Sequence, residues 1–500
     1  MPSPRILISG GRVLDIDGDL DQPAVADIFI ENGHITIVGA GATTAASQYA
    51  DVKKVDAQGK LIIPGLINAH YHSHDVMLRG MFEQLPLDAW MLYAGPANYA
   101  RPSPHQIKLR TTLGAAECLL NGITTVQDMP TIVGADHEHV DAILSSYEES
   151  GIRVVLAPQF SDRAPTECVP FWCDSPLAKL SMLSTPTDTR ALRKLIEERV
   201  GTTDIPRQRW ALGPSGPQRC TDDLLSWTAA LALRHGLQIF THLYEARSQA
   251  VLARQQYAKG SLIEHLAKFG LLGPNLTIAH GVWISSEEIE CFGEANANLA
   301  CNPVSNMKLL NGFAPVVQYA QSGAGIALGC DNCSGNDSQN MFQSMKTFAL
   351  LWGMYSQAGE TGAARAAFKA ATVGGASAVG MSGQLGLVRP GYKADLVLID
   401  LNNASYRPLN SAIRQLVYSE SGKGVDTVLV DGQIVVEKSG LKTVSEASLK
   451  EQAETWRAKL SIESKAVHNR NAGFLADILS AYEKANRYPI DFDRFLLRKH

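Results

Sequence analysis

Two histidines at alternate positions are placed to share one metal ion. Residues 64–72 form an apolar run that ends in His70 and His72. In a β-strand, side chains two residues apart point to the same face, so both imidazoles could reach one cation. His74 continues the alternation and leaves His72 with His74 as a second candidate pair. The simpler alternative is a pair of strand histidines with ordinary hydrogen bonds.

Three later residues could complete a metal site with this pair. His242, His280 and Asp331 each stand at the end of a later apolar run, as the histidine pair does. Imidazole nitrogens and carboxylate oxygens are donors that Zn²⁺ and Fe²⁺ accept in proteins. One metal centre explains all five residues.

Seven segments together make the chain similar to the amidohydrolase superfamily. They are residues 64–72 (PGLINAHYH), 79–80 (RG), 85–90 (LPLDAW), 242–245 (HLYE), 279–281 (AHG), 302–309 (NPVSNMKL) and 329–332 (GCDN). Within the superfamily the chain most resembles the branch that contains cytosine, guanine and S-adenosylhomocysteine deaminases and the triazine chlorohydrolases. The match runs in register from the N-terminus to about Ser439.

The resemblance implies a metal site of three imidazoles and one carboxylate: His70, His72, His242 and Asp331. This donor set, with one position left for water, suits one Zn²⁺ ion, with Fe²⁺ as the alternative. The Pro64-Gly65 turn and Asn68 set the register of the resemblance, and this register favours His70 with His72 as the pair. Dinuclear relatives carry a carbamylated lysine at the end of the fourth strand. The corresponding residues 211–219 contain no lysine, so a single metal is expected.

The resemblance also implies three catalytic side chains, Glu245, His280 and Asp331. Glu245 would take the proton of the metal-bound water and pass it to a ring nitrogen. His280 would hydrogen-bond the attacking hydroxide, and Asp331 would pass a proton to the departing group. From the residues alone, Glu245 could instead be a solvated residue in the first turn of a helix, where the helix dipole favours a carboxylate.

Side chains on loops near the strand ends are the candidates for substrate contacts. They are His74, Trp90, Tyr93, Gln159, Gln218, Asn306, Asn336 and Asp337, each of which could instead serve loop packing. Trp90 and Tyr93 could stack on a planar ring. Cys301 stands where the family commonly has histidine, and a thiol cannot donate as an imidazole does, so the group recognised there is expected to differ. The loop after Trp90 lacks the glutamate of several nucleoside deaminases, which argues against a nucleoside substrate.

The function implied by the resemblance is that of a metal-dependent hydrolytic deaminase. Its substrate would be a small aminated nitrogen heterocycle, such as a pyrimidine, purine, pterin or triazine, attacked by metal hydroxide. An alternative on the same fold and metal site is a hydrolase of an amide, a urea or a C–Cl bond. A third reading is a non-catalytic scaffold of the dihydropyrimidinase-like kind, but such proteins have lost metal ligands that this chain keeps. Relatives are often homodimers or homotetramers.

Strand-like runs that alternate with helical patterns must position these residues. Eight apolar runs lie at residues 66–72, 124–128, 152–158, 209–214, 237–242, 276–280, 297–301 and 325–331. This alternation predicts a (β/α)8 barrel, whose strands are buried on both faces. Every suspected ligand lies at the carboxyl end of a run, where barrel enzymes place their chemistry.

Both ends of the barrel segment continue into β-rich sequence, and we expect the two ends to pair into one small β-sandwich. Short β runs with Gly and Asp turns fill residues 6–61, and similar runs return at 394–400 and 425–436, where Asp431-Gly432 predicts a hairpin turn. The predicted α/β fold is therefore a (β/α)8 TIM-like barrel with a β-sandwich domain. Its parts are residues 1–63 and 380–440 for the sandwich, 64–379 for the barrel, and 441–500 for a C-terminal helical extension that serves packing or oligomer contacts.

Composition narrows the remaining classes. A net charge of −5 and a pI near 6.2 argue against nucleic-acid binding, which requires a basic face. A hydrophobic fraction of 45% with 19% charged residues is typical of a soluble globular chain. The chain start lacks an export signal core, and no apolar run reaches the ~20 residues that span a bilayer. We therefore expect a cytoplasmic protein with no membrane partner.

Overall fold

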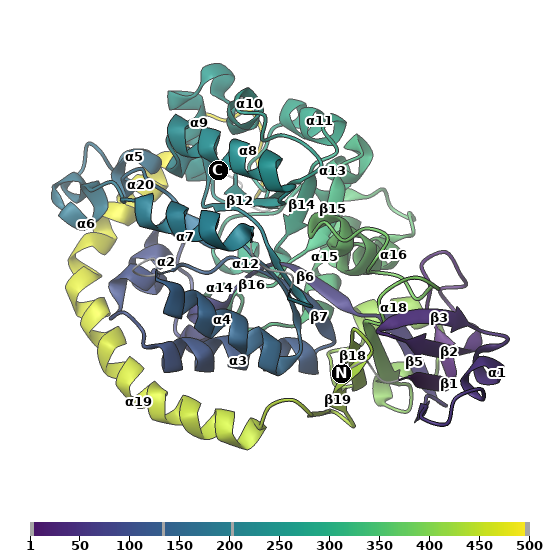
Figure 1. Ribbon diagram of the computed structural model, residues 1–500. Helices are drawn as coiled ribbons and strands as arrows, with labels where there is room; N and C mark the ends of the chain where they lie inside the picture. The colour runs from purple at the N-terminus through teal and green to yellow at the C-terminus, as the bar shows by residue number, and fades with distance from the viewer. Residues whose placement is uncertain (1–4, 133–135, 202–204, 496–500) are drawn as a thin grey trace.

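The middle of the chain folds into parallel strands that alternate with helices (Figure 1). The computed structural model describes residues 5–132, 136–201 and 205–495. Within these residues the strands form a five-stranded sheet β10-β8-β7-β6-β16, a four-stranded sheet β12-β13-β14-β15 and a pair β11-β9. Their bounds are β6 (Leu66–His72), β7 (Ile123–Asp128), β8 (Arg153–Leu156), β9 (Gln159–Phe160), β10 (Gln208–Trp210), β11 (Gly213–Pro214), β12 (Ile239–Leu243), β13 (Leu276–His280), β14 (Asn298–Cys301), β15 (Gly325–Leu328) and β16 (Asp331–Asn332).

Helices cover the outer face of these strands. Every residue of β6 and of β13 is buried, because the inner face of each strand packs in the core and the outer face packs on helices. The covering helices include α3 (Pro104–Leu120), α4 (His137–Ser150), α7 (Arg190–Val200), α8 (Asp222–His235), α9 (Arg247–Gln256), α10 (Leu262–Lys268), α11 (Ser286–Glu294), α13 (Val316–Ser322), α15 (Met341–Tyr355) and α16 (Ala363–Lys369). The strands follow one another in the order that the sequence predicts.

The ladders between these strands do not form one continuous ring in the described residues. β16 pairs with β6, through Asp331 and Tyr71, which brings the last strand beside the first. Between β10 and β12 a single bridge, Leu212 to Ile239, stands in place of a ladder, because the chain next enters β11, which pairs with β9. The described residues therefore form parallel sheets, but the ladders between their strands do not close into the ring of the predicted barrel.

Strands from both ends of the chain join in one sheet beside the barrel segment, to the right in Figure 1. Among the described residues this sheet has nine strands in the order β20-β19-β18-β17-β5-β1-β2-β3, with β4 paired to β1. The bounds are β1 (Ile6–Val13), β2 (Val25–Glu31), β3 (His34–Val38), β4 (Lys53–Asp56), β5 (Lys60–Pro64), β17 (Leu396–Asp400), β18 (Val425–Val430), β19 (Gln433–Glu437) and β20 (Gly440–Leu441). The two chain ends therefore pair, as the sequence predicts, through the antiparallel ladder between β5 and β17.

A buried ion-pair cluster ties the barrel segment to this sheet. Arg153 begins β8, its side chain is 3% exposed, and its Nη2 lies 2.9 Å from Oδ1 of Asp395 and 2.9 Å from Oδ1 of Asp431. We expect Arg153→Met to lower the stability of the protein by about 3–5 kcal/mol, because two carboxylates lose their buried partner. The measurement is the urea midpoint of unfolding. Arg190→Met is the control, since Arg190 pairs with Asp188 at the surface, and an unchanged midpoint in both variants would contradict the prediction.

The C-terminal extension forms two long helices, α19 (Glu446–Asn471) and α20 (Leu475–Arg487), at the places where the sequence predicts helices. α19 runs along the outer edge of the molecule beside α2 (Leu87–Ala94) and α3, and α20 packs on α2 and α9 (Figure 1). Asn471 is fully buried and donates to the carbonyl oxygen of Leu92 at 2.7 Å. The extension therefore packs on its own chain. The last residues of the predicted extension, 496–500, lie outside the described residues.

Candidate metal centre

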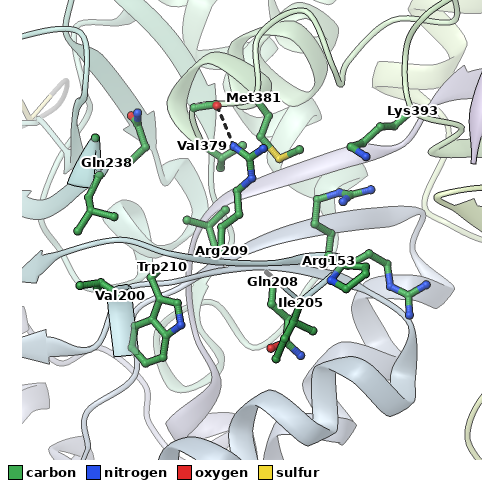
Figure 2. A pocket seen from close by; sticks show the side chains of 16 residues that line it. Arg153, Val200, Ile205, Gln208, Arg209, Trp210, Gln238, Val379, Met381 and Lys393 are labelled. Carbon is green, nitrogen blue, oxygen red and sulfur yellow. Dashed lines mark hydrogen bonds between the residues drawn. The ribbon is translucent and has the colours of Figure 1, made fainter. Parts of the chain in front are cut away.

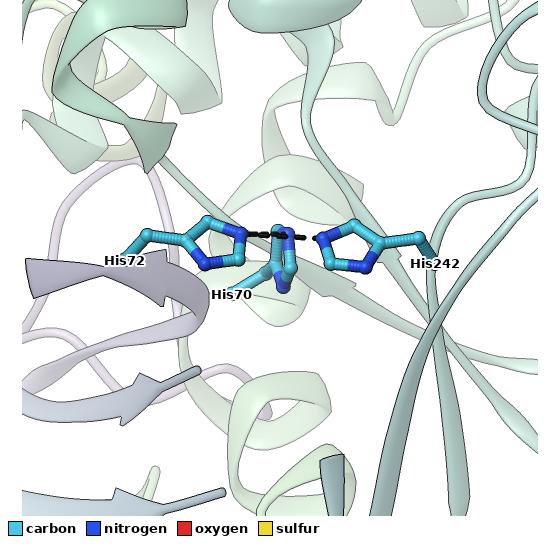
Figure 3. A group of neighbouring side chains, drawn as sticks. All are labelled: His70, His72 and His242. Carbon is cyan, nitrogen blue, oxygen red and sulfur yellow. Dashed lines mark hydrogen bonds between the residues drawn. The ribbon is translucent and has the colours of Figure 1, made fainter. Parts of the chain in front are cut away.

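Three histidine side chains meet at the carboxyl ends of β6 and β12 (Figure 3). Nε2 of His72 lies 3.2 Å from Nε2 of His70 and 3.2 Å from Nε2 of His242. The Nδ1 atoms of His72 and His242 face away from this point, each 2.7 Å from a carbonyl oxygen, that of Met129 and that of Ser215. An Nδ1 atom must carry the proton to donate to a carbonyl, so each Nε2 presents a lone pair.

Lone pairs that face one another repel unless a cation lies between them. Burial lowers the pKa of His70 to about 4 and the pKa of His242 well below its usual value, so both rings are neutral at pH 7. The ligand atoms of the three histidines all lie within 4.8 Å of one another. Neutral imidazoles that converge in this way are the donors that zinc and iron bind, so the cluster fits a divalent metal ion.

Asp331 brings a carboxylate to the same point. Its Oδ1 lies 3.4 Å from Nε2 of His70 and 3.5 Å from Nε2 of His72, and this buried atom has no hydrogen-bond partner among the described residues. Its Oδ2 accepts from Oγ of Ser305. Burial alone would raise the pKa of Asp331, but the neighbouring imidazoles of His70 and His280 hold it well below its usual value. The ionised Oδ1 is thus available as a fourth ligand.

His280 and Glu245 face each other beside the histidine cluster. Nε2 of His280 lies 3.6 Å from Oε2 of Glu245 and 4.0 Å from Oδ2 of Asp331. Nδ1 of His280 lies 2.8 Å from Oδ1 of Asn306, and Oε1 of Glu245 accepts from Nδ2 of Asn311 at 3.0 Å. Burial raises the pKa of Glu245 to about 7, so this carboxyl group can both take up and release a proton near neutral pH.

The backbone is strained where two of these side chains leave their strands. His280 has φ 75° and Asp331 has φ 61°, in the left-handed region that residues other than glycine seldom adopt. His280 ends β13, and Asp331 begins the short strand β16 that follows β15. Strain of this kind persists where surrounding contacts enforce it, and it gathers at functional sites.

A cavity of about 100 Å³ opens over the cluster. Four of the predicted substrate residues, His74, Trp90, Gln159 and Gln218, line it together with His72, His242, Glu245, His280 and Asp331. The structure thus brings the two groups of predicted residues, for chemistry and for substrate contact, to one place. The volume is that of a tight pocket for a small planar molecule.

The other four predicted substrate residues do not line this cavity. Tyr93 stacks on His468 of α19, with ring centroids 5.3 Å apart. Asn306 holds His280, as described above. Asn336 donates to backbone carbonyl oxygens of its own loop, and Asp337 accepts from the backbone N–H of Gly80 at 2.7 Å and pairs with Lys308. These residues shape the surrounding loops.

Comparison with known proteins gives the family. Residues 61–435 match the model of the amidohydrolase family. The chain belongs to this family. The 5′-deoxyadenosine deaminase of Methanothermobacter thermautotrophicus is 33% identical over 462 residues, which are 92% of this chain and 100% of that protein. The 5-methylthioadenosine/S-adenosylhomocysteine deaminase of Thermococcus sibiricus is 32% identical over 436 residues, which are 86% of this chain and 94% of that protein.

Two solved structures share the fold. A zinc-bound adenosine deaminase from Xanthomonas campestris has a TM-score of 0.80 at 25% identity, and the match covers 92% of this chain and 100% of that one. A zinc complex of atrazine chlorohydrolase from Arthrobacter aurescens has a TM-score of 0.79 at 23% identity, over 90% of this chain and 100% of that one. The TIM-barrel-type α/β fold that the sequence predicts is therefore confirmed.

The predicted hydrolysis of carbon–nitrogen bonds, the deaminase chemistry and the divalent metal ion are supported by the family. This amidohydrolase is an enzyme that hydrolyses carbon–nitrogen bonds, and its predicted chemistry as a hydrolytic deaminase of a heterocycle agrees with the relatives. The convergent histidines and the zinc-bound neighbour support a divalent metal ion at the site. In the described part of the chain, no helix is both long and apolar enough to cross a membrane.

Three side chains of the amidohydrolase site are not among those predicted from the sequence. Arg219 and Gln249 line the cavity, and Asn311 donates to Glu245. Arg219 directly follows Gln218 at the end of the fourth strand region, so its position was a usable signal. Asn311 lies 66 residues after Glu245, and no spacing in the sequence indicates that the two meet.

Asn306 positions His280, so removal of the Asn306 side chain should lower kcat. Oδ1 of Asn306 lies 2.8 Å from Nδ1 of His280, and this contact directs Nε2 of His280 at the cavity. We expect Asn306→Ala to lower kcat about 10- to 100-fold with the metal content unchanged, the usual size for losing a partner that orients a site histidine. The measurement is kcat from steady-state kinetics, together with the metal content of the same sample. A kcat equal to that of the unaltered protein would show that His280 needs no such partner.

Proposed function

We propose that the substrate of this deaminase is an adenine nucleoside without a 5′ phosphate, whose 6-amino group is replaced by oxygen with release of ammonia. The observation that carries the proposal is the meeting of Glu245, His280 and Asp331 beside three convergent imidazoles. The names of the relatives, 5′-deoxyadenosine and 5-methylthioadenosine/S-adenosylhomocysteine deaminases, supply the substrate class. All of these molecules carry an adenine base.

The proposed metal ligands are His70, His72, His242 and Asp331, holding one Zn²⁺ ion, with Fe²⁺ as the alternative. Zinc is supported by the zinc-bound adenosine deaminase that shares the fold. The unpartnered Oδ1 of Asp331 and the facing Nε2 atoms are the donor set that such an ion requires. When bound, the ion lowers the pKa of a coordinated water towards neutrality.

The remaining steps belong to the side chains of the chain itself. Glu245, with a pKa near 7, takes a proton from the attacking water and delivers it to the ring nitrogen next to the reacting carbon. His280, 3.6 Å from Glu245, hydrogen-bonds the attacking oxygen. Asp331 takes the second proton of the same water from the added hydroxyl group and passes it to the amino group, which leaves as ammonia. Water and the aminated ring thus become the oxo ring and ammonia.

A second cavity beside the first supports a substrate longer than a free base. It has a volume of about 70 Å³ and shares His74, Ala94 and Pro96 with the catalytic cavity. Helix α19 supplies Trp456 and Leu460 to its wall. A nucleoside could place its base over the metal site and its sugar end towards this second cavity, so the C-terminal extension would contribute to substrate choice.

A nucleoside substrate differs from the expectation based on the missing glutamate after Trp90. Relatives at about one-third identity are named for nucleoside substrates, and we give their names more weight. Hydrolysis of an amide, a urea or a C–Cl bond is kept as the alternative. It has less support, because the triazine hydrolases are 22–23% identical and therefore share the fold alone.

The test is ammonia release against a panel of substrates. The panel contains 5′-deoxyadenosine, adenosine, S-adenosylhomocysteine, cytosine and guanine, with a chlorotriazine and a substituted urea for the alternative. We expect ammonia from the adenine nucleosides and a substrate preference among them set by the 5′ group. Chloride release without ammonia would favour the alternative, and ammonia from no aminated ring would contradict the proposal.

We also propose the architecture, the cellular location and the oligomeric state of the enzyme. The parallel strands are taken as one closed eight-stranded barrel, which is supported by the pairing of β16 with β6 and by the bridge from Leu212 to Ile239. The domain bounds remain those predicted: 1–63, 64–379, 380–440 and 441–500. A cytoplasmic homodimer or homotetramer remains a prediction, which light scattering of the purified protein would test.

A further inference from the structure

The chain that follows α20 packs on two loops of the barrel segment. The first loop, residues 281–285, directly follows β13. The second loop, residues 309–315, joins α12 (Pro303–Lys308) to α13. Residues 488–495, here called the C-terminal segment, contact both loops through Arg494. The end of the chain is therefore in contact with loops that lie beside the catalytic side chains.

The side chain of Arg494 is buried and holds the first loop through two carbonyl oxygens. Its Nε donates to the carbonyl oxygen of Val282 at 3.1 Å, and its Nη2 donates to that of Ile284 at 2.7 Å. Val282 and Ile284 are fully buried, so their carbonyl groups need donors from the protein itself. Burial lowers the pKa of Arg494, which means that placing the charge here costs free energy, and the two hydrogen bonds offset this cost. The planar fork of one guanidinium thus fixes two carbonyl groups of the loop.

The first loop is attached to the backbone of both catalytic side chains. The chain enters the loop through His280, whose φ of 75° persists only under contacts from its surroundings. The N–H group of Val282 then donates to the carbonyl oxygen of Tyr244 at 2.9 Å. Tyr244 directly precedes Glu245, so a shift of the first loop would move Glu245 relative to His280.

A second route from the C-terminal segment to Glu245 passes through the second loop. The N–H group of Phe313 donates to the carbonyl oxygen of Arg494 at 3.0 Å. Nδ2 of Asn311, two residues earlier, donates to Oε1 of Glu245 at 3.0 Å. Nε1 of Trp283 donates to the carbonyl oxygen of Asn311 at 2.6 Å, which joins the two loops. Arg494 therefore contacts both loops that set the position of the Glu245 carboxyl group.

We propose that Arg494 is a positioning residue of the deaminase, whose guanidinium group holds the first loop so that Glu245 and His280 face each other. The inference rests on the roles that the proposed function gives to Glu245 and His280. Nε2 of His280 lies 3.6 Å from Oε2 of Glu245. Arg494 is not among the described residues that line the catalytic cavity, so it acts through the loops and not on the substrate.

Arg494→Met and Arg494→Lys test the inference on the panel compound that the unaltered protein converts fastest. The measurements are kcat, KM, metal content and the urea midpoint of unfolding. Methionine donates no hydrogen bond to the loop, and we expect its kcat to fall on the order of 10²-fold, the cost of misplacing a catalytic group by about 1 Å. KM should stay within about twofold, because Arg494 does not line the cavity. The metal content should be unchanged, because the proposed ligands lie outside both loops.

The lysine variant separates positioning from a general effect on stability. Lysine keeps the charge but has a single ammonium group in place of the fork, so it can hold the loop only in part. We expect its kcat to lie between those of Arg494→Met and the unaltered protein, again with KM unchanged. A residue that only stabilises the fold would not give this graded return of kcat at constant KM.

Arg254→Met and Arg153→Met are the controls, and both should keep the kcat of the unaltered protein. Arg254 pairs with Asp491 at the surface, so its variant loosens the C-terminal segment without removing the donors to the first loop. Figure 2 shows Arg153 in the wall of a separate cavity of about 540 Å³, whose described lining includes neither loop. Arg153→Met loses stability, as predicted above, and shows whether lost stability alone lowers kcat.

The outcomes distinguish this inference from the proposed function. A kcat of Arg494→Met equal to that of the unaltered protein would contradict the inference alone. Losses of kcat in Arg254→Met or Arg153→Met as large as in Arg494→Met would do the same, because the effect would then not depend on the donors of Arg494. An unaltered protein that converts no panel compound would overturn both the proposed function and this inference.

Discussion

Glu245→Gln is expected to keep its metal and to lose turnover by a factor of about 10²–10⁴, the contribution of a general acid–base group. Glutamine has the shape of glutamate, and its carbonyl oxygen can still accept from Nδ2 of Asn311. It cannot take up and release a proton near pH 7, which the raised pKa of Glu245 allows. The measurement combines kcat for 5′-deoxyadenosine with metal analysis of the same sample.

The control for this variant is Glu290→Gln, the same chemical change at an exposed position of α11. It should retain both metal and turnover. A Glu245→Gln protein with full activity would remove Glu245 as the proton carrier and would leave His280 and Asp331 as the candidates. Loss of metal together with activity would instead show that Glu245 supports the metal site, since the side chain is 5% exposed and close to its ligands.

The residues that meet in the cavity could be predicted because each follows an apolar run and because the resemblance to the amidohydrolase superfamily fixes their register. His70 and His72 alternate within an apolar run, and Asp331 stands after another, so the direction of each side chain follows from the strand geometry. Parallel strands then bring their carboxyl ends together without further information.

Loop residues could not be predicted in the same way. Tyr93 turns to His468, 375 positions later in the chain, and Asp337 turns to Lys308. Neither partner is indicated by any local pattern, because loop conformations are set by contacts between segments that are remote in sequence. The hydrogen bond from Asn311 to Glu245 could not be predicted for the same reason, because the two residues are remote in sequence.

The pairing of the chain ends could be predicted in outline. The β-rich sequence at both ends indicated that they join, and β5 does pair with β17. Alternation of side chains does not give the register between two strands that are remote in sequence. The position of Val397 opposite Ile63 therefore came only from the structure.

Asp331→Ala is expected to lose turnover and to release its metal to a chelator that leaves the unaltered protein loaded. Among the described residues, no group donates to the buried Oδ1 of Asp331, and removal of this oxygen takes away the one anionic donor proposed for the ion. His70, His72 and His242 remain and can hold the ion only more weakly. Turnover falls further than metal content, because the proton carrier for the leaving amino group is also gone.

Asp331→Asn and Asp223→Ala complete the experiment. Asparagine keeps the size of Asp331 and one oxygen but loses the charge, so metal retention should lie between those of the alanine variant and the unaltered protein. Asp223 pairs with Arg193 at the surface and should be replaceable without effect on metal or turnover. Zinc content by plasma emission, measured after dialysis against the chelator, separates the cases. If Asp331→Ala kept a full equivalent of zinc, the carboxylate would not be a ligand, and the ion would have to rest on the histidines alone.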